Sequence, residues 1–128
     1  MLDTIAREPL WRHLINYRCG TGHSVSHVGN VHEGPHALNG RNTTVFKPGM
    51  IVTDEPGVYE GGVVGIRIEN ELECYHKASN QYGEFLAFRP IMFVPIATSP
   101  IVPGVLSRDE LDWLNATTAR SSRSWLPA

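Results

Sequence analysis

Three histidines near the start of the chain are the first candidates for chemistry. They are His23, His27 and His32, half of the six histidines in the sequence. Imidazole nitrogen and carboxylate oxygen form the natural ligand set of Mn2+, Zn2+ and Co2+. Because a lone histidine in a small domain is more often a surface or hydrogen-bonded residue than a ligand, the spacing of the surrounding residues has to decide.

Two sets of acidic residues are candidate partners for these histidines. Glu55 ends a mostly apolar run that begins at Ile51, where an ionised carboxylate is costly unless it is paired or bound to a metal. Glu69, Glu71 and Glu73 alternate along a predicted strand, which places like charges about 7 Å apart on one face. Water alone can relieve that repulsion, so a solvated face and a cation site both remain open.

Composition limits the class of protein. A chain of 128 residues and 14.2 kDa forms one small domain at most, and its 12 glycines and 9 prolines predict turns and short strands rather than a helical bundle. With 11 basic against 13 acidic residues, it lacks the positive charge that holds nucleic acid. No apolar run reaches the roughly 18 residues of a membrane span, and no secretory signal is evident. We therefore expect a cytoplasmic protein without a nucleic-acid or membrane partner.

The elements that must position the candidate residues are short. Residues 2–18 predict a helix in two pieces, with Asp3 capping the first and Pro9 starting the second. Residues 19–35 have no helical period and predict strands and turns, and the polar stretch 36–49 predicts a surface loop.

Strand patterns dominate the middle of the chain. Residues 50–55 predict a short strand whose alternation places Thr53 and Glu55 on one face. Residues 66–75 show the clearest alternation, with Arg67 on the side of the glutamates. The remaining predicted elements are strands over 85–88 and 91–96 and a helix that a Ser107–Glu110 capping box opens and that runs to about residue 117.

Four blocks of sequence, in this order, resemble Xaa-Pro aminopeptidases of the creatinase and methionine-aminopeptidase superfamily. The blocks are Gly20-Thr-Gly-His23, Asn30-Val-His-Glu-Gly-Pro35, Thr53-Asp-Glu-Pro-Gly57 and Gly65-Ile-Arg-Ile-Glu-Asn70. With Asp112-Trp-Leu-Asn115 near the end, the set is similar to the long cytosolic type. The resemblance implies an α+β fold, the C-terminal half of a pita-bread fold, with an antiparallel sheet and flanking helices over residues 1–116 and a divergent, flexible tail over 117–128.

The family suggests a role for each matching residue. In such enzymes two metal ions, usually manganese, hold a water or hydroxide that attacks the peptide carbonyl before proline. The resemblance implies that His23, Glu55 and Glu69 are metal ligands, with Glu69 shared by both ions. His32 resembles the histidine that hydrogen-bonds the substrate carbonyl, so His32 and Glu55 are the expected catalytic residues. Arg67 would hold a ligand carboxylate in place, although an ordinary cross-strand ion pair is the alternative.

Two further residues are candidates for binding substrate. His27 fits a Gly-His-x-x-x-His spacing and is a candidate for the substrate pocket, with a structural role as the alternative. Cys19 occupies the place where the family usually has a histidine that positions substrate, and a neutral thiol is a poor substitute. Cys19 and Cys74 form no Cys-x-x-Cys pair, so we expect both thiols to be reduced.

The sequence also departs from the family pattern. Two aspartate ligands of the family lie far upstream of the Gly-Thr-Gly-His block, whereas the only aspartate before His23 is Asp3, at a position that is not a ligand in the family. We therefore expect at most one weakly held ion, Mn2+ first and Zn2+ or Co2+ as alternatives. Truncation at both ends is the simplest account of these departures.

Two functions follow as hypotheses. The first is a metal-dependent aminopeptidase that releases the amino-terminal residue of peptides with proline in second position, with a homodimer as in the family. The second is a non-catalytic fragment or degenerate homologue that serves as a binding or subunit-interface module. An unrelated three-histidine metal protein such as a cupin would need a His-x-His pair, which the sequence lacks.

Overall fold

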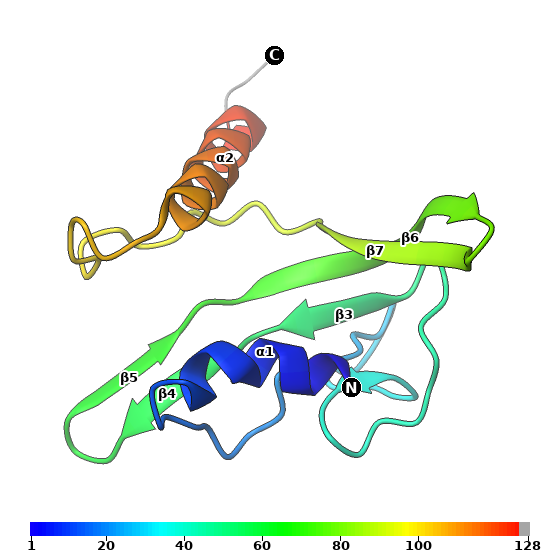
Figure 1. Cartoon of the computed structure of the whole chain (residues 1–128), viewed down its shortest axis with the longest axis horizontal. Coiled ribbons are helices and arrows are strands. Elements are labelled where there is room, and N and C mark those ends of the chain that lie inside the picture. Colours follow the sequence, from blue (N-terminus) through cyan, green and yellow to red (C-terminus); the bar gives the residue numbers. More distant parts are fainter. Residues whose placement is uncertain (126–128) are drawn as a thin grey trace. The chain divides into compact units, whose positions relative to one another are not determined.

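The computed structural model describes residues 1–125 (Figure 1). Contacts divide the chain into two compact units, Met1–Ile91 and a second unit that begins at Met92. The first unit holds α1 and all the strands, and the second holds α2. In chain order the elements are α1 (Leu2–Trp11), β1 (Gly22–His23), β2 (Ala37–Leu38), β3 (Ile51–Asp54), β4 (Gly57–Glu60), β5 (Val64–Arg67), β6 (Asn70–Asn80), β7 (Gly83–Pro90) and α2 (Arg108–Trp125).

A three-stranded antiparallel sheet, in the order β3-β6-β7, forms the centre of the first unit. Its register pairs Val52 with Leu72 and Cys74 with Phe88. Val52 and Cys74 are fully buried, so the small core lies on this sheet. Cys19 and Cys74 are both free thiols. The strands and helices confirm an α+β class with antiparallel pairing.

The chain 51–73 folds as one long hairpin with an interruption in the middle. The pairs Asp54–Asn70 and Gly57–Arg67 flank the interruption and keep the same register, so Glu55 runs opposite Glu69. The ladder breaks there because Pro56 has no N–H to donate. The single strand predicted over 66–75 is therefore wrong, and two strands, β5 and β6, replace it.

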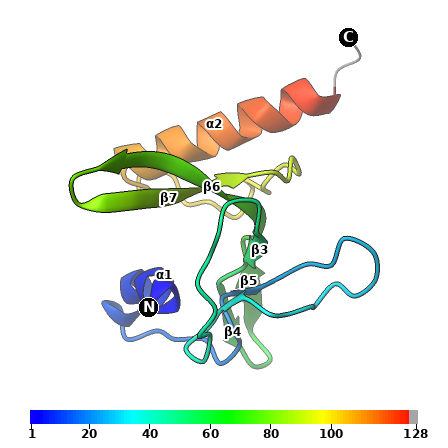
Figure 2. The same ribbon diagram turned by 90° about the vertical axis from the view of Figure 1, so that its right-hand side faces the viewer.

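The first helix differs from its prediction. Residues 2–11 form one α-helix that includes Pro9, rather than two pieces separated there. The helix ends only two residues after Pro9, so the lost hydrogen bond affects its last turn. Asp3 makes no cap, because its carboxylate is buried and bonds instead to Arg7 and Thr21. In Figure 2, α1 lies on one side of the β3–β5 strands and the loop between β1 and β2 extends on the other.

Two other short segments, Ala37–Leu38 and residues 91–96, also depart from the predictions. Ala37–Leu38 pairs with β1 inside the stretch expected to be a loop over 36–49. Residues 91–96 form no strand, and Pro95 removes one of the backbone donors that a strand would need there.

The second unit contains the predicted capping box, which the structure confirms. The Ser107 hydroxyl accepts from the Glu110 backbone N–H at 3.3 Å, and the Glu110 carboxylate accepts from the Ser107 backbone N–H at 2.7 Å. Helix α2 continues to Trp125, so the predicted end near residue 117 is wrong. The hydroxyls of Thr117, Thr118 and Ser122 donate to carbonyls one turn earlier, which satisfies them within the helix. Of the predicted flexible tail, residues 126–128 lie outside the described residues.

None of the helices in the part of the chain that the structure describes is long and apolar enough to cross a membrane.

Candidate metal centre

His23 and Glu55 meet where the β1 segment runs antiparallel beside β3. His23 Nε2 lies 3.0 Å from Glu55 Oε1, and the two side chains are only 17% and 12% exposed. Backbone contacts set this approach. The Glu55 N–H donates to the Thr21 carbonyl at 2.7 Å, and Ser24 pairs with Val52 in an isolated antiparallel β-bridge. An imidazole and a carboxylate from distant parts of the sequence are thus held side by side.

The loop after β1 returns His32 to the same place. The Glu33 N–H donates to the Ser24 carbonyl at 3.0 Å, which closes the loop. The ring centroids of His23 and His32 are 3.9 Å apart, with an angle of 42° between the planes. Ligand atoms of His23, His32 and Glu55 all lie within 4.8 Å of one another, and His32 is the exposed member. We call these three residues the metal-centre triad.

The hydrogen bonds of His23 favour a cation between the imidazole and the carboxylate. Its Nδ1 lies 3.0 Å from the Ser24 carbonyl oxygen, which can only accept, so Nδ1 carries a proton. Nε2 lies 3.0 Å from Glu55 Oε1, and the Nδ1-protonated tautomer presents a lone pair there, as a cation ligand does. Histidine ligands usually donate their other N–H to a carbonyl or carboxylate. The donor set therefore fits a divalent cation of the Mn2+, Zn2+ or Co2+ type.

Thr53 supports both ligands from the buried face of β3. Its hydroxyl donates to Glu55 Oε1 at 3.0 Å and accepts from the His23 backbone N–H at 3.0 Å. Thr53 is buried. Sequence reasoning placed Thr53 on the face of Glu55 but gave it no role; its hydroxyl, two residues from a candidate ligand on the same face, was the available signal.

Arg67 approaches the other carboxylate oxygen. Its Nη1 lies 3.1 Å from Glu55 Oε2, and its Nε donates to the Tyr59 hydroxyl at 2.7 Å. The hydrogen bond to Tyr59 raises the pKa of Arg67 above its usual value, and the charge of Glu55 adds to the effect. Arg67 thus holds the carboxylate of Glu55, and Tyr59, which sequence reasoning missed, holds Arg67.

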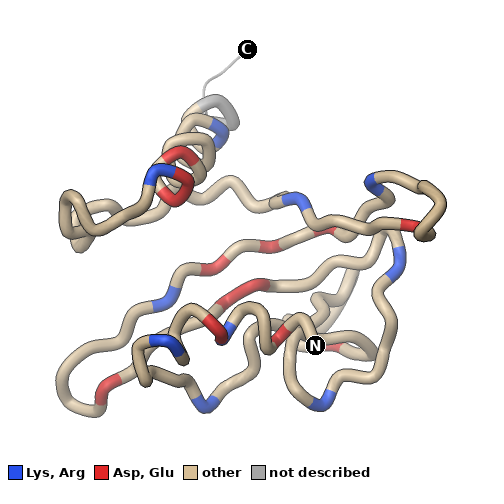
Figure 3. The backbone as a smooth tube through the Cα atoms, viewed as in Figure 1, with Lys and Arg blue, Asp and Glu red and all other residues tan. Residues whose placement is uncertain are grey.

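Glu69 is not brought into the triad. Its side chain is exposed, and it is absent from the group of ligand atoms found among the described residues. The hairpin register nevertheless runs Glu69 opposite Glu55, and acidic residues recur along both arms of this hairpin (Figure 3). Directly opposite residues of antiparallel strands have Cβ atoms about 4.5–5.5 Å apart, which long side chains span easily.

The two predicted substrate-binding residues line separate hollows of the first unit. Cys19 is exposed and lines a hollow of about 650 Å³ together with Tyr59 and Arg67. His27 is exposed and lines one of about 490 Å³ with His36. Cys19 therefore shares a hollow with the residue that pairs with Glu55, whereas His27 does not join the triad.

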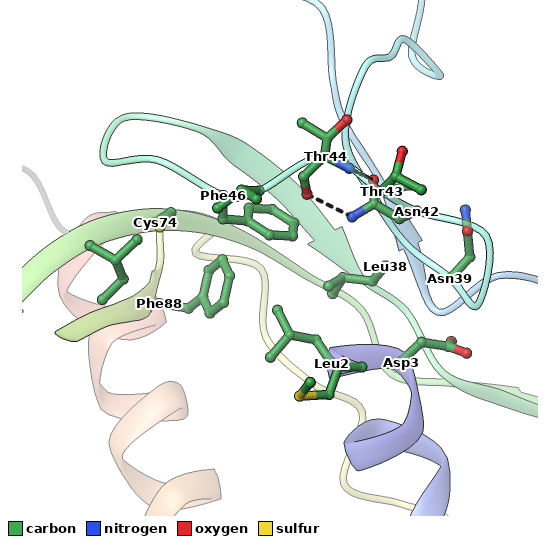
Figure 4. Close-up of a pocket in the computed structure, with 14 residues that line it drawn as sticks. Leu2, Asp3, Leu38, Asn39, Asn42, Thr43, Thr44, Phe46, Cys74 and Phe88 are labelled. Carbon is green, nitrogen blue, oxygen red and sulfur yellow. Dashed lines mark hydrogen bonds between the residues drawn. The ribbon is translucent and has the colours of Figure 1, made fainter. Parts of the chain in front are cut away.

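A further hollow, of about 360 Å³, is mainly apolar and holds none of the predicted site residues (Figure 4). Its wall includes Leu2, Leu38, Phe46 and Phe88, and the rings of Phe46 and Phe88 meet edge to face with centroids 5.3 Å apart.

Comparison with known proteins identifies similar chains. The model of metallopeptidase family M24 matches residues 1–75. Aminopeptidase P1 of Lotus japonicus is 41% identical over 124 residues, 93% of this chain and 19% of that protein. Aminopeptidase P2 of Arabidopsis thaliana is 44% identical over 121 residues, 91% of this chain and 17% of that protein. The chain thus spans about one fifth of the length of the curated relatives it matches.

A solved structure is similar over nearly the whole chain. The crystal structure of X-prolyl aminopeptidase from Caenorhabditis elegans, described as a cytosolic enzyme with a di-nuclear active site, matches with a TM-score of 0.83 and 38% identity. The match covers 94% of this chain and 20% of that one. It confirms the expected α+β class as part of the pita-bread aminopeptidase fold. The assignment of residues 1–116 to one portion of a catalytic domain stays a prediction.

Proposed function

Because the chain belongs to metallopeptidase family M24, we propose that His23 and Glu55 of its metal-centre triad bind one divalent cation as part of the catalytic centre of an Xaa-Pro aminopeptidase. The observation that carries the proposal is the 3.0 Å approach of His23 Nε2 to Glu55 Oε1 while His23 Nδ1 is tied to a carbonyl. The substrates are peptides with proline in second position, which the description of the similar structure as an X-prolyl aminopeptidase supports.

Each residue of the site has a separate role in the proposed enzyme. His23 and Glu55 hold the cation, and the bonds from Thr53 and Arg67 keep the Glu55 carboxylate turned toward it. A divalent cation bound there supplies Lewis acidity toward water and toward the peptide carbonyl. His32, the exposed member of the triad, is free to donate a hydrogen bond to the carbonyl oxygen of the scissile peptide, where negative charge develops.

Glu69 is proposed as a further ligand. It runs opposite Glu55 across the interrupted ladder, and its side chain is exposed. Two cations in one site need more carboxylate charge than Glu55 and Glu69 provide, because excess positive charge repels. We therefore propose that this chain alone holds at most one ion, and that Mn2+ is that ion.

The setting of the proposed enzyme follows from its relatives. The similar structure from Caenorhabditis elegans is described as cytosolic, which supports a cytoplasmic location. A homodimer is proposed from the family resemblance alone.

Two residues outside the triad are proposed to contact the substrate. Cys19 lines the same hollow as Arg67 and would take the place of the family's histidine. His27 lines a separate hollow and would contact another part of the substrate peptide.

Calorimetric titration with Mn2+ tests the metal centre directly. The wild-type chain should bind one Mn2+ with micromolar affinity, and Glu55→Gln should weaken binding by about tenfold or more because a charged ligand becomes a neutral amide. Glu84→Gln is the matched control, since Glu84 is exposed on β7 and outside the triad. Mixing without heat in the wild type, or equal affinity in Glu55→Gln, would overturn the proposal.

A non-catalytic module is the second candidate. The described residues offer a single group of three possible ligands, whereas the family's catalytic site holds two ions. Cys19, in place of the family's histidine, also favours this candidate. Turnover of an Arg-Pro-Pro peptide with Mn2+ distinguishes the two candidates. Release of arginine by the chain alone would exclude the module, whereas metal binding without turnover would support it.

A further inference from the structure

Arg7 on α1 joins the helix to the segment that leads into the metal-centre triad. Its Nε lies 2.9 Å from Asp3 Oδ2 on the previous turn. Its Nη1 donates to the Tyr17 carbonyl at 2.7 Å, and its Nη2 donates to the Cys19 carbonyl at 2.6 Å. The guanidinium also lies 3.9 Å from the centre of the Tyr17 ring. One planar group therefore ties α1 to two carbonyls of the segment between α1 and β1.

The Thr21 hydroxyl bonds to both Asp3 and Tyr17. It donates to Asp3 Oδ1, which uses its one proton, so the Tyr17 hydroxyl must donate to Thr21 Oγ1. Thr21 is fully buried, and Asp3 and Tyr17 are also buried. The side-chain oxygens of Asp3, Tyr17 and Thr21 thus all have partners within the network.

The backbone of Thr21 touches the site directly. Its carbonyl accepts the Glu55 N–H at 2.7 Å, and its N–H donates to the Leu38 carbonyl at 2.8 Å. The next residue, Gly22, packs so closely on β3 that an added Cβ would lie 1.8 Å from the Thr53 oxygen. Any shift of Thr21 would therefore be passed to Glu55 through a hydrogen bond and to His23 through two residues of chain.

We propose that Asp3, Arg7, Tyr17 and Thr21 are positioning residues through which α1 sets the distance between His23 and Glu55. None of the four belongs to the triad. A buried ion pair such as Asp3–Arg7 adds little net stability, because desolvation offsets attraction, so stability alone does not account for it. The inference rests on the proposed function only for its metal readout.

Thr21→Val and Thr21→Ser form the decisive pair of variants. Valine keeps the shape of threonine and loses the hydroxyl, whereas serine keeps the hydroxyl. Thr21→Val should raise the Kd for Mn2+ about tenfold, the size of effect seen when a supporting partner of a ligand is lost. Thr21→Val should also speed hydrogen exchange of the Glu55 amide in the absence of metal. Thr21→Ser should keep both the Kd for Mn2+ and the exchange rate close to the wild-type values. Thr118→Val, which removes a helix hydroxyl in α2, should change neither.

The two readouts separate failure of this inference from failure of the proposed function. If the wild type binds no Mn2+, the proposed function fails, and Glu55 amide exchange still decides the network. Folded Thr21→Val with unchanged exchange and unchanged Kd would overturn the inference, as would a loss that Thr21→Ser does not restore. If circular dichroism shows Thr21→Val to be unfolded, Tyr17→Phe, which removes the other hydroxyl of the network, is measured in the same way and decides by the same criteria.

Discussion

The Thr53 hydroxyl donates a hydrogen bond to the Glu55 carboxylate over 3.0 Å and, through the same oxygen, accepts the backbone N–H of His23. One buried side chain on β3 therefore touches both ligands of the proposed metal centre. The hydroxyl can meet both demands because it has one proton to donate and lone pairs to accept.

Replacing Thr53 by valine should weaken Mn2+ binding by about tenfold to a hundredfold, the range for loss of an outer-shell partner. Valine fills the buried space but removes the hydrogen bonds from the Thr53 hydroxyl to Glu55 Oε1 and from the His23 N–H to that hydroxyl. Thr53→Ser keeps the hydroxyl and should bind Mn2+ close to wild type in calorimetry. Equal affinity of the valine and serine variants would show that the hydroxyl has no part in holding Glu55.

Gly22 should not tolerate a side chain. An alanine Cβ would lie 1.8 Å from the Thr53 carbonyl oxygen, so β1 would have to move away from β3. We expect Gly22→Ala to lower the free energy of unfolding by about 1–3 kcal/mol, as overpacking does, measured by urea denaturation. Gly61→Ala is the control, because nothing lies within 4 Å of the added Cβ. A Gly22→Ala variant as stable as Gly61→Ala would contradict the close packing of the two strands.

Glu69→Gln and Arg67→Lys should differ in their effect on the metal. If Glu69 turns toward the triad when the cation binds, its neutral amide cannot replace the charge, and affinity for Mn2+ should fall. Arg67→Lys keeps a positive charge near Glu55 Oε2 while losing the bond to Tyr59, so the fall should be smaller. Calorimetry on the two variants measures the difference. Equal affinities would remove Glu69 from the ligand set.

The stability that the Ser107–Glu110 capping box adds to α2 should depend on pH. Hydrogen bonds from Ser107 lower the pKa of Glu110 below its usual value. Because the folded pKa is the lower one, this contribution to helix stability is present above the unfolded pKa, about 4.5, and is lost as pH falls through the folded pKa. Ser107→Ala should raise the pKa of Glu110 in an NMR titration, whereas Ser122→Ala, which removes another hydroxyl of the helix, should not.

Local patterns predicted the local elements well. The strand 50–55 and the capping box were confirmed, because alternation and capping depend on neighbours a few residues apart. The single strand over 66–75 failed because its break is imposed by Pro56 on the opposite strand, which no pattern within 66–75 reveals. The strand predicted over 91–96 does not form, since Pro95 lacks a backbone donor. Helix α2 continues past residue 117, where the hydroxyls of Thr118 and Ser122 bond to carbonyls of the preceding turn.

The sequence by itself determined the family and the residue types of the site, since four ordered blocks carry His23, His32, Glu55 and Glu69. Only the tertiary structure decided which of them meet: His32 lies against His23, Arg67 pairs with Glu55, and Glu69 stays outside the triad. It also decided that Asp3, predicted to cap a helix, is a buried partner of Thr21. These contacts join residues far apart in the chain, and such pairing depends on strand register and side-chain packing rather than on local sequence preference.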